Sequence, residues 1–287
     1  MLIRDIKKMN IIIVGLGVIG ASYAIGLKKM GCENIYGVDT NKDTLTKAVQ
    51  MKIIKEGFTD GASILSVGDI IILAIYPKDI INFVINSIKF FKKNSIITDV
   101  GGIKSKMIGS ILEILPNDID FIFGHPMAGR EKKGIDYATD EVFQGANYII
   151  TPTFKNKKEN IELWEKIILD MGFGQVKKIT PELHDKIIGY TSQLTHIIAV
   201  ALMNSEKKEY QIKNFIGDSF RDLTRIAKIN EDLWTELFIE NRENLISSIE
   251  DFQKQLENLK ISIINEDESQ LKKLLKSSTD KREMLDK

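Results

Sequence analysis

Short apolar runs alternate with amphipathic segments through the first 180 residues. The runs are almost continuous in Ile, Val and Phe and lack the polar alternation of a half-exposed strand. Strands of a parallel sheet that is covered on both faces have this pattern. The segments between them, such as 80–91, 104–115 and 159–171, have helical character, so the succession predicts an α/β, Rossmann-type doubly wound sheet. We expect its strands at 11–14, 35–38, 70–75, 96–100, 121–123, 148–150 and 176–179.

The pattern changes after residue 180, where no further strand is predicted. Helices are expected at 181–204 and at about 214–227. A long helix follows, and one more helix is expected at the end of the chain. The length of 287 residues is comfortable for two domains. We therefore divide the chain into an α/β domain, 1–180, and an all-α domain, 181–287.

The long helix has a coiled-coil-like seam, because its apolar residues alternate steps of four and three. On a small helical domain such a seam predicts a homodimer through that domain, and packing within one chain is the alternative. The last helix is expected to begin with Asn265 as its N-cap and Glu268 in a capping box. The seam consists of Leu245, Ile249, Phe252, Leu256, Leu259 and Ile263, with Phe238 upstream on the same predicted helix.

Composition narrows the class of protein. A formal net charge of zero argues against nucleic acid as the main partner. No apolar run reaches the roughly 18 residues of a membrane span, so no membrane association is predicted. The single cysteine, Cys32, cannot form an internal disulfide. A reducing compartment is the default for such a chain, and we expect a cytoplasmic protein.

A glycine-rich turn follows the first predicted strand. Gly15-Leu16-Gly17-Val18-Ile19-Gly20 has the G-x-G-x-x-G spacing and leads into a helix. Its glycines permit a tight turn and a close approach of the backbone to a pyrophosphate. Asp39 ends the next strand, where an acidic side chain binds the ribose hydroxyls of a dinucleotide. No arginine follows it to bind a 2′-phosphate, so NAD is favoured over NADP.

A second strand ends in Asp99-Val100-Gly101-Gly102. Glycines at this turn again permit close approach to a ligand, and Asp99 is a candidate cofactor contact. The same residues could equally be the ordinary start of a helix.

The strongest catalytic candidate is His125, which follows the strand at 121–123 in Gly124-His125-Pro126. The chain holds only three histidines, and imidazole exchanges protons near neutral pH. The carboxyl end of a strand is where ligands bind in open α/β sheets. A hydrogen-bonded loop histidine is the alternative. His184 and His196 are too far apart on one predicted helix to share a metal ion, and we predict no metal site.

Arg221 and Arg225 are one helical turn apart and are expected to project from the same face. Two guanidinium groups make a site for an anion, preferably a dicarboxylate, and Asp222 could hold one of them. A solvated charged face is the alternative.

Together these motifs resemble the prephenate/arogenate dehydrogenase family over almost the whole chain. The resemblance implies NAD-dependent oxidative decarboxylation of prephenate to 4-hydroxyphenylpyruvate in tyrosine biosynthesis, with arogenate, converted directly to tyrosine, as the alternative substrate. The matching segments are Gly15–Gly20, Gly124-His125-Pro126-Met127-Ala128-Gly129 with Glu131, His184-Asp185 with Ser192-Gln193-Leu194-Thr195-His196, and Phe220-Arg221-Asp222-Leu223-Thr224-Arg225 with Trp234.

The resemblance also implies residue roles. His125 would accept the proton of the substrate hydroxyl as hydride leaves the same carbon. Arg225 would bind a substrate carboxylate, with Arg221 and His196 nearby, and Glu131 would order the site and gate access to it. Gly102 stands where the family often has a serine that would touch the catalytic imidazole, and Ser105 is the residue that could substitute.

This sequence departs from the family pattern at Gln193 and Thr195, which replace a His and a Pro, and at Arg130. A β-hydroxyacid dehydrogenase or a pyrroline-carboxylate reductase would have the same two-domain plan. The predicted interdomain helix offers Lys186 as a catalytic lysine, but without the glycines that surround it in hydroxyacid enzymes. An NAD-sensing module without activity would need neither His125 nor the arginine pair.

Overall fold

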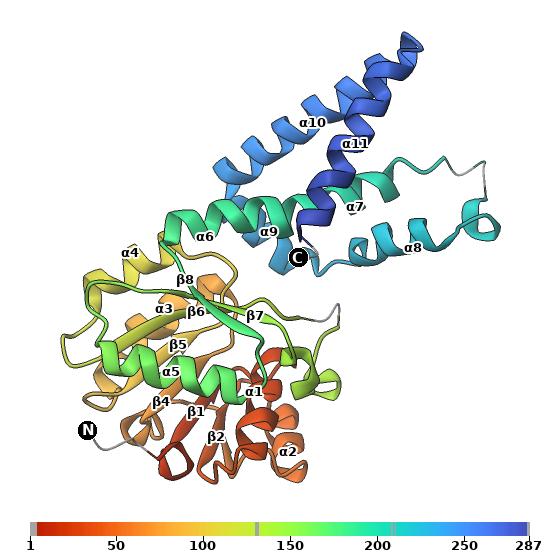
Figure 1. Ribbon diagram of the computed structural model, residues 1–287. Helices are drawn as coiled ribbons and strands as arrows, with labels where there is room; N and C mark the ends of the chain where they lie inside the picture. Colours follow the sequence, from red (N-terminus) through yellow and green to blue (C-terminus); the bar gives the residue numbers. More distant parts are fainter. Residues whose placement is uncertain (1–4, 130–131, 208, 210, 286–287) are drawn as a thin grey trace.

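A computed structural model describes residues 5–129, 132–207, 209 and 211–285. The α/β half contains an eight-stranded sheet in the order β3-β2-β1-β4-β5-β6-β7-β8 (Figure 1). Every neighbouring pair is parallel except β6 and β7. The predicted doubly wound fold is therefore confirmed. The strands are β1 Ile11–Val14, β2 Ile35–Val38, β3 Glu56–Phe58, β4 Ile70–Leu73, β5 Ile96–Asp99, β6 Asp120–Pro126, β7 Asn147–Thr151 and β8 Gln175–Lys178.

The central strands are apolar throughout because helices cover both faces of the sheet. Ile11 and Ile13 of β1 belong to one buried cluster, whereas Ile12 and Val14 belong to another on the opposite face. Successive side chains of a strand point to opposite faces, so neither face is left for water. The covering helices are α1 Val18–Lys29, α2 Lys42–Gln50, α3 Pro77–Ser87, α4 Ser105–Ile114 and α5 Lys158–Asp170.

Two strands differ from the sequence-based expectation. β3 was missed, since it is a three-residue edge strand with Phe58 as its one large apolar residue. β6 is longer than the predicted 121–123 because β7 pairs with it antiparallel as far as Pro126. His125 therefore lies within the strand, opposite Ile149 of β7, which fixes its backbone more firmly than a loop would.

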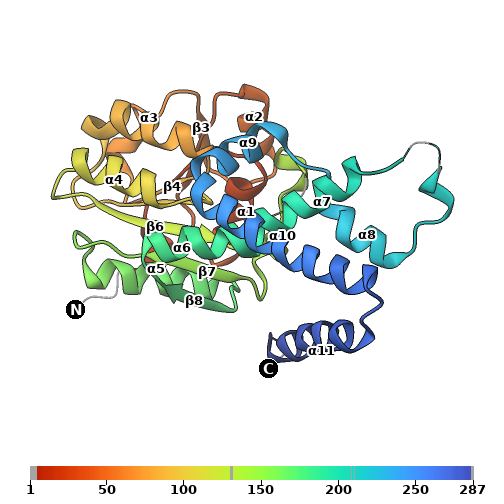
Figure 2. The same cartoon turned by 90° about the horizontal axis from the view of Figure 1, so that it is seen from above.

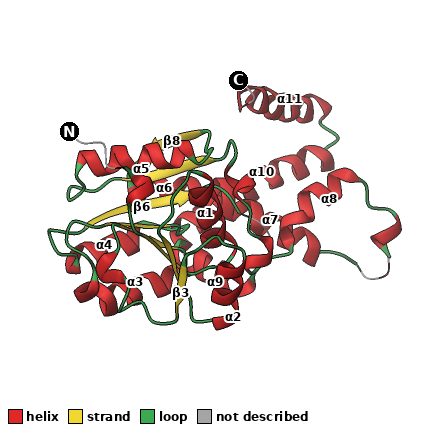
Figure 3. Cartoon of the chain, turned by 90° about the horizontal axis from the view of Figure 1, so that it is seen from below, coloured by secondary structure: helices red, strands yellow, loops and turns green. Residues whose placement is uncertain are grey.

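The second half is helical, and Figure 3 shows no strand in it among the residues that the structure describes. Its helices are α6 Pro181–Ile188, α7 Leu194–Asn204, α8 Asp218–Thr224, α9 Glu231–Glu240, α10 Arg242–Ile264 and α11 Glu268–Leu285. A π-helical segment, Gly189–Gln193, joins α6 to α7, so the expected helix over 181–204 is continuous. None of these helices in the described part of the chain is long and apolar enough to cross a membrane.

Two predictions about the C-terminal helices were wrong. The long helix is divided at Asn241, whose side chain donates to Asp185 O and Gln193 Oε1 and so draws α9 toward α6. Asn265 ends α10, and the cap of α11 is Asp267, which accepts from Gln270 N at 2.9 Å. A tertiary contact and a local turn, neither visible in the apolar periodicity, caused both errors.

The helical half contacts the carboxyl edge of the sheet. Helix α9 lies above the α/β half in Figure 1 and overlaps it in Figure 2, which is seen from above. Glu236 of α9 accepts a hydrogen bond at 2.6 Å from Lys78 N, in the first turn of α3, and Asn230 donates to the Tyr76 hydroxyl at 3.2 Å. The strand order reverses between β1 and β4, and ligands of open α/β sheets bind at the carboxyl edge beside such a reversal. The domain junction therefore lies where a ligand site is expected.

Candidate active site

The glycine-rich turn has the geometry that a dinucleotide needs. Gly15 has φ +87°, and a Cβ there would lie 2.4 Å from Ala74 O. A Cβ on Gly20 would lie 1.9 Å from Gly15 O, so helix α1 packs directly on the turn. Gly17, the N-cap of α1, has open space where its side chain would be. A pyrophosphate can approach that space and the backbone N–H groups of the first helical turn.

The other residues of the turn act through their backbone. The Leu16 and Val18 side chains are buried and Ile19 is half-buried. Leu16 N donates to Asp39 Oδ2 at 2.8 Å, and Asn41 N donates to Asp39 Oδ1 at 2.9 Å. These two bonds hold the Asp39 carboxylate beside the glycine-rich turn, in the position expected of the group that binds ribose hydroxyls.

Asp99 is buried within the protein and does not have the exposed position expected of a cofactor contact. Its side chain is fully buried and forms an ion pair with the equally buried Lys104. It also accepts from Gly101 N at 2.8 Å and Gly124 N at 3.1 Å. With its oxygens engaged inside the protein, Asp99 fixes the turn after β5 against β6, and we leave it out of the cofactor site.

His125 is held by its neighbours on both sides of the strand. A Cβ on Gly124 would lie 2.0 Å from the Tyr148 hydroxyl oxygen, so the buried Tyr148 packs where only a glycine fits. A Cβ on Gly102 would lie 3.8 Å from His125 Nε2 and 3.4 Å from Leu237 Cδ2. The structure thus brings His125, Gly102 and α9 together at the domain junction.

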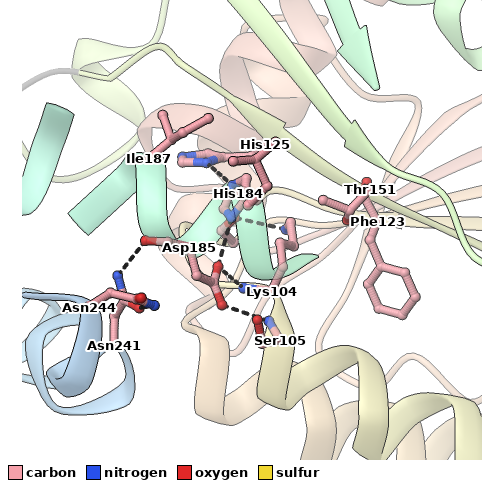
Figure 4. Close-up of polar contacts among 12 residues, drawn as sticks. Lys104, Ser105, Phe123, His125, Thr151, His184, Asp185, Ile187, Asn241 and Asn244 are labelled. Carbon is pink, nitrogen blue, oxygen red and sulfur yellow. Dashed lines mark hydrogen bonds and ion pairs between the residues drawn. The ribbon is translucent and has the colours of Figure 1, made fainter. Parts of the chain in front are cut away.

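A chain of hydrogen bonds extends from His125 into the helical half (Figure 4). His125 Nδ1 lies 2.9 Å from His184 Nε2, and His184 Nδ1 lies 2.7 Å from Asp185 Oδ1. Asp185 accepts from Lys104 N at 2.9 Å and from Ser105 N at 2.8 Å. We call His125, His184 and Asp185 the relay. From the sequence, His184 was considered as a metal ligand and Asp185 only as part of a family motif, although an acid directly beside one of three histidines was a usable signal.

The surroundings of the relay are apolar. Ile103, Ile149 and Ile188 form a small buried cluster, and Met127 and Leu237 pack against it. Burial lowers the pKa of His125 well below its usual value, with further lowering from His184 and the Lys104 ammonium. Burial also lowers the pKa of His184, although Asp185 opposes the effect. Both imidazoles are therefore neutral at neutral pH.

Ser105 lies at the far end of the relay. Its N–H donates to Asp185 Oδ2 at 2.8 Å and so supports the carboxylate.

His196 is placed by α9. Its ring packs against Trp234 with centroids 3.6 Å apart and ring planes tilted by 31°, and its Nδ1 donates to Ser192 O at 2.8 Å. The imidazole is half-buried. His196 thus joins α7 to α9, the helix that also contacts Gly102 through Leu237.

The arginines lie further along the helical half. Arg221 is exposed on α8, which stands away from the sheet in Figures 1 and 2, and it pairs with Asp218 at 3.0 Å rather than with Asp222. Arg225 follows α8 and opens the 3-10 turn Arg225–Ala227, which packs against α7, the helix of His196. Arg130 and Glu131 lie outside the described residues.

Two other expectations concern Lys186 and a metal ion. Lys186 is exposed on α6, while its neighbours His184 and Asp185 are buried, so it does not take the place of the catalytic lysine in a hydroxyacid dehydrogenase. Within the described residues, no group of three or more His, Cys, Asp or Glu side chains could hold a metal ion.

Comparison with known proteins identifies the family. The family model of the prephenate dehydrogenase nucleotide-binding domain matches residues 23–176, and that of the prephenate dehydrogenase dimerization domain matches residues 180–277. The chain belongs to the prephenate dehydrogenase family. The resemblance read from the sequence motifs is thereby confirmed, and the hydroxyacid dehydrogenase and pyrroline-carboxylate reductase alternatives give way to it.

Individual members of the family are similar over nearly the full chain. Prephenate dehydrogenase of Lactococcus lactis is 31% identical over 90% of this chain and 72% of its own length. The Aquifex aeolicus prephenate dehydrogenase, solved with hydroxyphenyl propionate and NAD+, superimposes with a TM-score of 0.88 at 34% identity, covering 96% of this chain and 98% of that one. Synechocystis arogenate dehydrogenase gives 0.82 at 29% identity, covering 96% and 100%.

The position of Asp39 predicts cofactor preference. We expect kcat/KM with NAD to exceed that with NADP by at least about 10²-fold, because a carboxylate beside the ribose repels a 2′-phosphate. Asp39→Asn should lower this ratio by about tenfold, while Asp43→Asn, which removes an exposed charge from the adjacent helix α2, should leave it unchanged. Equal efficiency of the wild-type enzyme with both cofactors would contradict the role of Asp39.

Proposed function

We propose that this protein is an NAD-dependent prephenate dehydrogenase that converts prephenate to 4-hydroxyphenylpyruvate and CO2 in tyrosine biosynthesis. The observation that carries the proposal is the placement of His125 at the domain junction. Its Nδ1 is occupied by His184, and its Nε2 lies near Gly102, on the sheet edge that carries the dinucleotide turn. Such an imidazole can accept a proton from a substrate bound beside the cofactor.

The chemistry divides between cofactor and protein. NAD, when bound, accepts the hydride that leaves C4 of the cyclohexadiene ring. His125 takes the proton of the C4 hydroxyl, and a positioned imidazole typically contributes about 10²–10⁴-fold to such a step. The glycine-rich turn and Asp39 would bind the pyrophosphate and a ribose. The apolar cluster around His125 keeps the base neutral and excludes water from the reacting carbon.

Substrate recognition is assigned to the helical half. Arg225 would bind a substrate carboxylate, with Arg221 and His196 near the same end, and Glu131 would order the site. Gly102 would leave room for the ring beside the imidazole. A residue that binds the departing carboxylate should not stabilise the bound substrate more than the transition state. An interaction that favours the ground state raises the barrier and slows the reaction.

Arogenate is the second candidate substrate, because a structural relative at 29% identity is an arogenate dehydrogenase. The two substrates differ in one group, a keto or an amino function on the side chain. NADH formation at 340 nm with each substrate under identical conditions decides between them, and the larger kcat/KM identifies the substrate.

Replacing His125 tests the base. His125→Asn should bind NAD as the wild type does but lose about 10²–10⁴-fold in kcat. In the wild type, kcat/KM should be constant near neutral pH and fall in acid only below pH 6.5, since burial lowers the pKa of His125 and protonation removes the base. A variant that retained wild-type kcat across this range would remove His125 from the mechanism.

Replacing Arg225 tests the carboxylate clamp. Arg225→Ala should raise KM for prephenate by about 10- to 150-fold, the range for a lost hydrogen bond to a charged group, with NAD affinity unchanged. Lys228→Ala removes an exposed cation from the same segment and serves as the control. If both variants share the wild-type KM, Arg225 lies outside the substrate site.

We further propose that the enzyme is a cytoplasmic homodimer assembled through α10. The C-terminal half matches a dimerization domain. In the single chain, the seam residues Phe252, Leu256 and Ile263 are exposed by 36%, 55% and 62%. Apolar side chains exposed in a row mark an interaction surface, and a second copy of the same helix would cover them.

Leu256→Glu should therefore weaken the dimer by at least about tenfold, because it places a charge in an apolar interface. Gln253→Glu adds the same charge to the same helix outside the seam and should not change the assembly. Sedimentation velocity at micromolar concentration measures both. Wild-type mass for Leu256→Glu would place the interface elsewhere.

A further inference from the structure

We propose that His184 and Asp185 are positioning residues that fix the tautomer of His125. In that tautomer Nδ1 carries the proton and Nε2 presents a lone pair to the substrate hydroxyl. The relay would hold the hydroxyl proton during the reaction and return it to the product. This inference rests on the proposed function for its kinetic consequences but not for its structural content.

The tautomer follows from the far end of the relay. An ionised carboxylate only accepts hydrogen bonds. Three donors point at Asp185: Lys104 N, Ser105 N and His184 Nδ1. These bonds keep the pKa of Asp185 below its usual value despite its burial, so the group is ionised. The ring proton of neutral His184 therefore sits on Nδ1.

His184 Nε2 is then an acceptor, and His125 must donate to it. Since a neutral imidazole has one N–H, the His125 proton sits on Nδ1 and its Nε2 is unprotonated. A carboxylate two rings away thus determines which nitrogen of the base faces the reacting hydroxyl. Within the described residues, the hydrogen bond to His184 is the one that orients the His125 ring.

Gly102 makes this dependence on His184 stronger. A side chain at that position would begin 3.8 Å from His125 Nε2 and could bind it, but glycine supplies no such group. The relay therefore orients the ring from its Nδ1 side.

The buried charges beside the relay are an ion pair, Lys104 with Asp99. Lys104 is fully buried beside His184 and Asp185, but it is paired with Asp99 and donates to Gly101 O at 2.8 Å. Among the described groups beside the relay, Asp185 is therefore the charged group that has no oppositely charged partner of its own. When His125 accepts a proton, the resulting imidazolium and this carboxylate attract one another through the intervening His184 ring.

The reaction needs no exchange of protons with water, which agrees with a relay that ends inside the protein. The C4–H bond breaks and its electron pair leaves as hydride to NAD, while the hydroxyl proton moves to His125 Nε2. The bond to the ring carboxylate then breaks, CO2 leaves, and its electron pair completes the aromatic ring with a phenolate oxygen. The phenolate recovers the proton from His125. No proton is gained or lost overall, so the buried His184 and Asp185 need no exit to water.

Asp185→Asn is the sharpest test. Lys104 N and His184 Nδ1 share Asp185 Oδ1, whereas Ser105 N binds Oδ2. An asparagine with its oxygen at the first position still accepts from His184, but its NH2 group meets the Ser105 N–H, and the imidazolium formed at His125 loses the carboxylate that attracts it. We expect kcat to fall by about 10²-fold or more while NAD affinity stays within about twofold. Asp120→Asn is the matched control, because Asp120 is equally buried and accepts from Lys157 N and Asn160 far from the relay; its kcat should not change.

Nitrogen-15 NMR of histidine-labelled protein reads the tautomers without any substrate. With three histidines in the chain, His125→Asn and His184→Gln assign the signals. We expect Nδ1-protonated rings for His125 and His184 in the wild type, and a His125 proton that is no longer held on Nδ1 in His184→Leu, which removes its acceptor. A wild-type His125 protonated on Nε2 would overturn the inference, as would an Asp185→Asn variant with wild-type kcat.

A second pair of variants covers the case in which Asp185→Asn does not fold. His184→Gln keeps an acceptor for His125 Nδ1, whereas His184→Leu removes it at similar size. We expect His184→Leu to lose at least about tenfold more kcat than His184→Gln, and equal losses would overturn the inference. If the wild type turns over neither prephenate nor arogenate, the proposed function fails, yet the NMR experiment still decides the tautomer.

Discussion

The carboxylate of Asp185 is the group on which the arrangement of the site depends. It comes from the helical half, yet it binds Lys104 N and Ser105 N at the first turn of α4, a helix without a side-chain cap of its own. Unpaired N–H groups and the helix dipole both favour a negative charge there. One residue thus caps a helix of the α/β half, joins the two halves and orients His184. The same pair of oxygens caps α4 and holds the His184 ring.

Buried charge is expensive unless it is paired and hydrogen-bonded. The site contains three such charges: Lys104 and Asp99, which form an ion pair, and Asp185, which accepts from three donors. The Lys104 ammonium also donates to Gly101 O, so the turn that carries Gly102 is held by the ion pair. Removal of either partner would leave a charge in an apolar setting. This explains why the turn after β5, although glycine-rich, presents a fixed surface to His125.

Helix α9 connects the surroundings of His125 to α10, the helix proposed to form the dimer. It places Leu237 against Gly102 and Trp234 against His196. Directly after it, Asn241 donates to Asp185 O at 2.9 Å and marks the start of α10, the helix of the apolar seam. A second copy packed on α10 would therefore contact the helix that begins directly after Asn241, the residue that binds the backbone of the relay.

The sequence by itself determined the class of fold and the glycine-rich turn, and it singled out His125 as the catalytic candidate. These features are local: apolar runs, glycine spacing and a histidine at the end of a strand act over a few residues, where side-chain periodicity and backbone freedom decide the outcome. Tertiary structure decided the partners. His125 meets His184 across 59 residues, and Lys104 and Ser105 meet Asp185 across 81 and 80. Asp99, read from its position as a ligand contact, turned out to be buried against Lys104. Nothing in a local pattern specifies which of many acids pairs with which histidine, because that choice is made only when packing brings distant segments together and excludes water from between them.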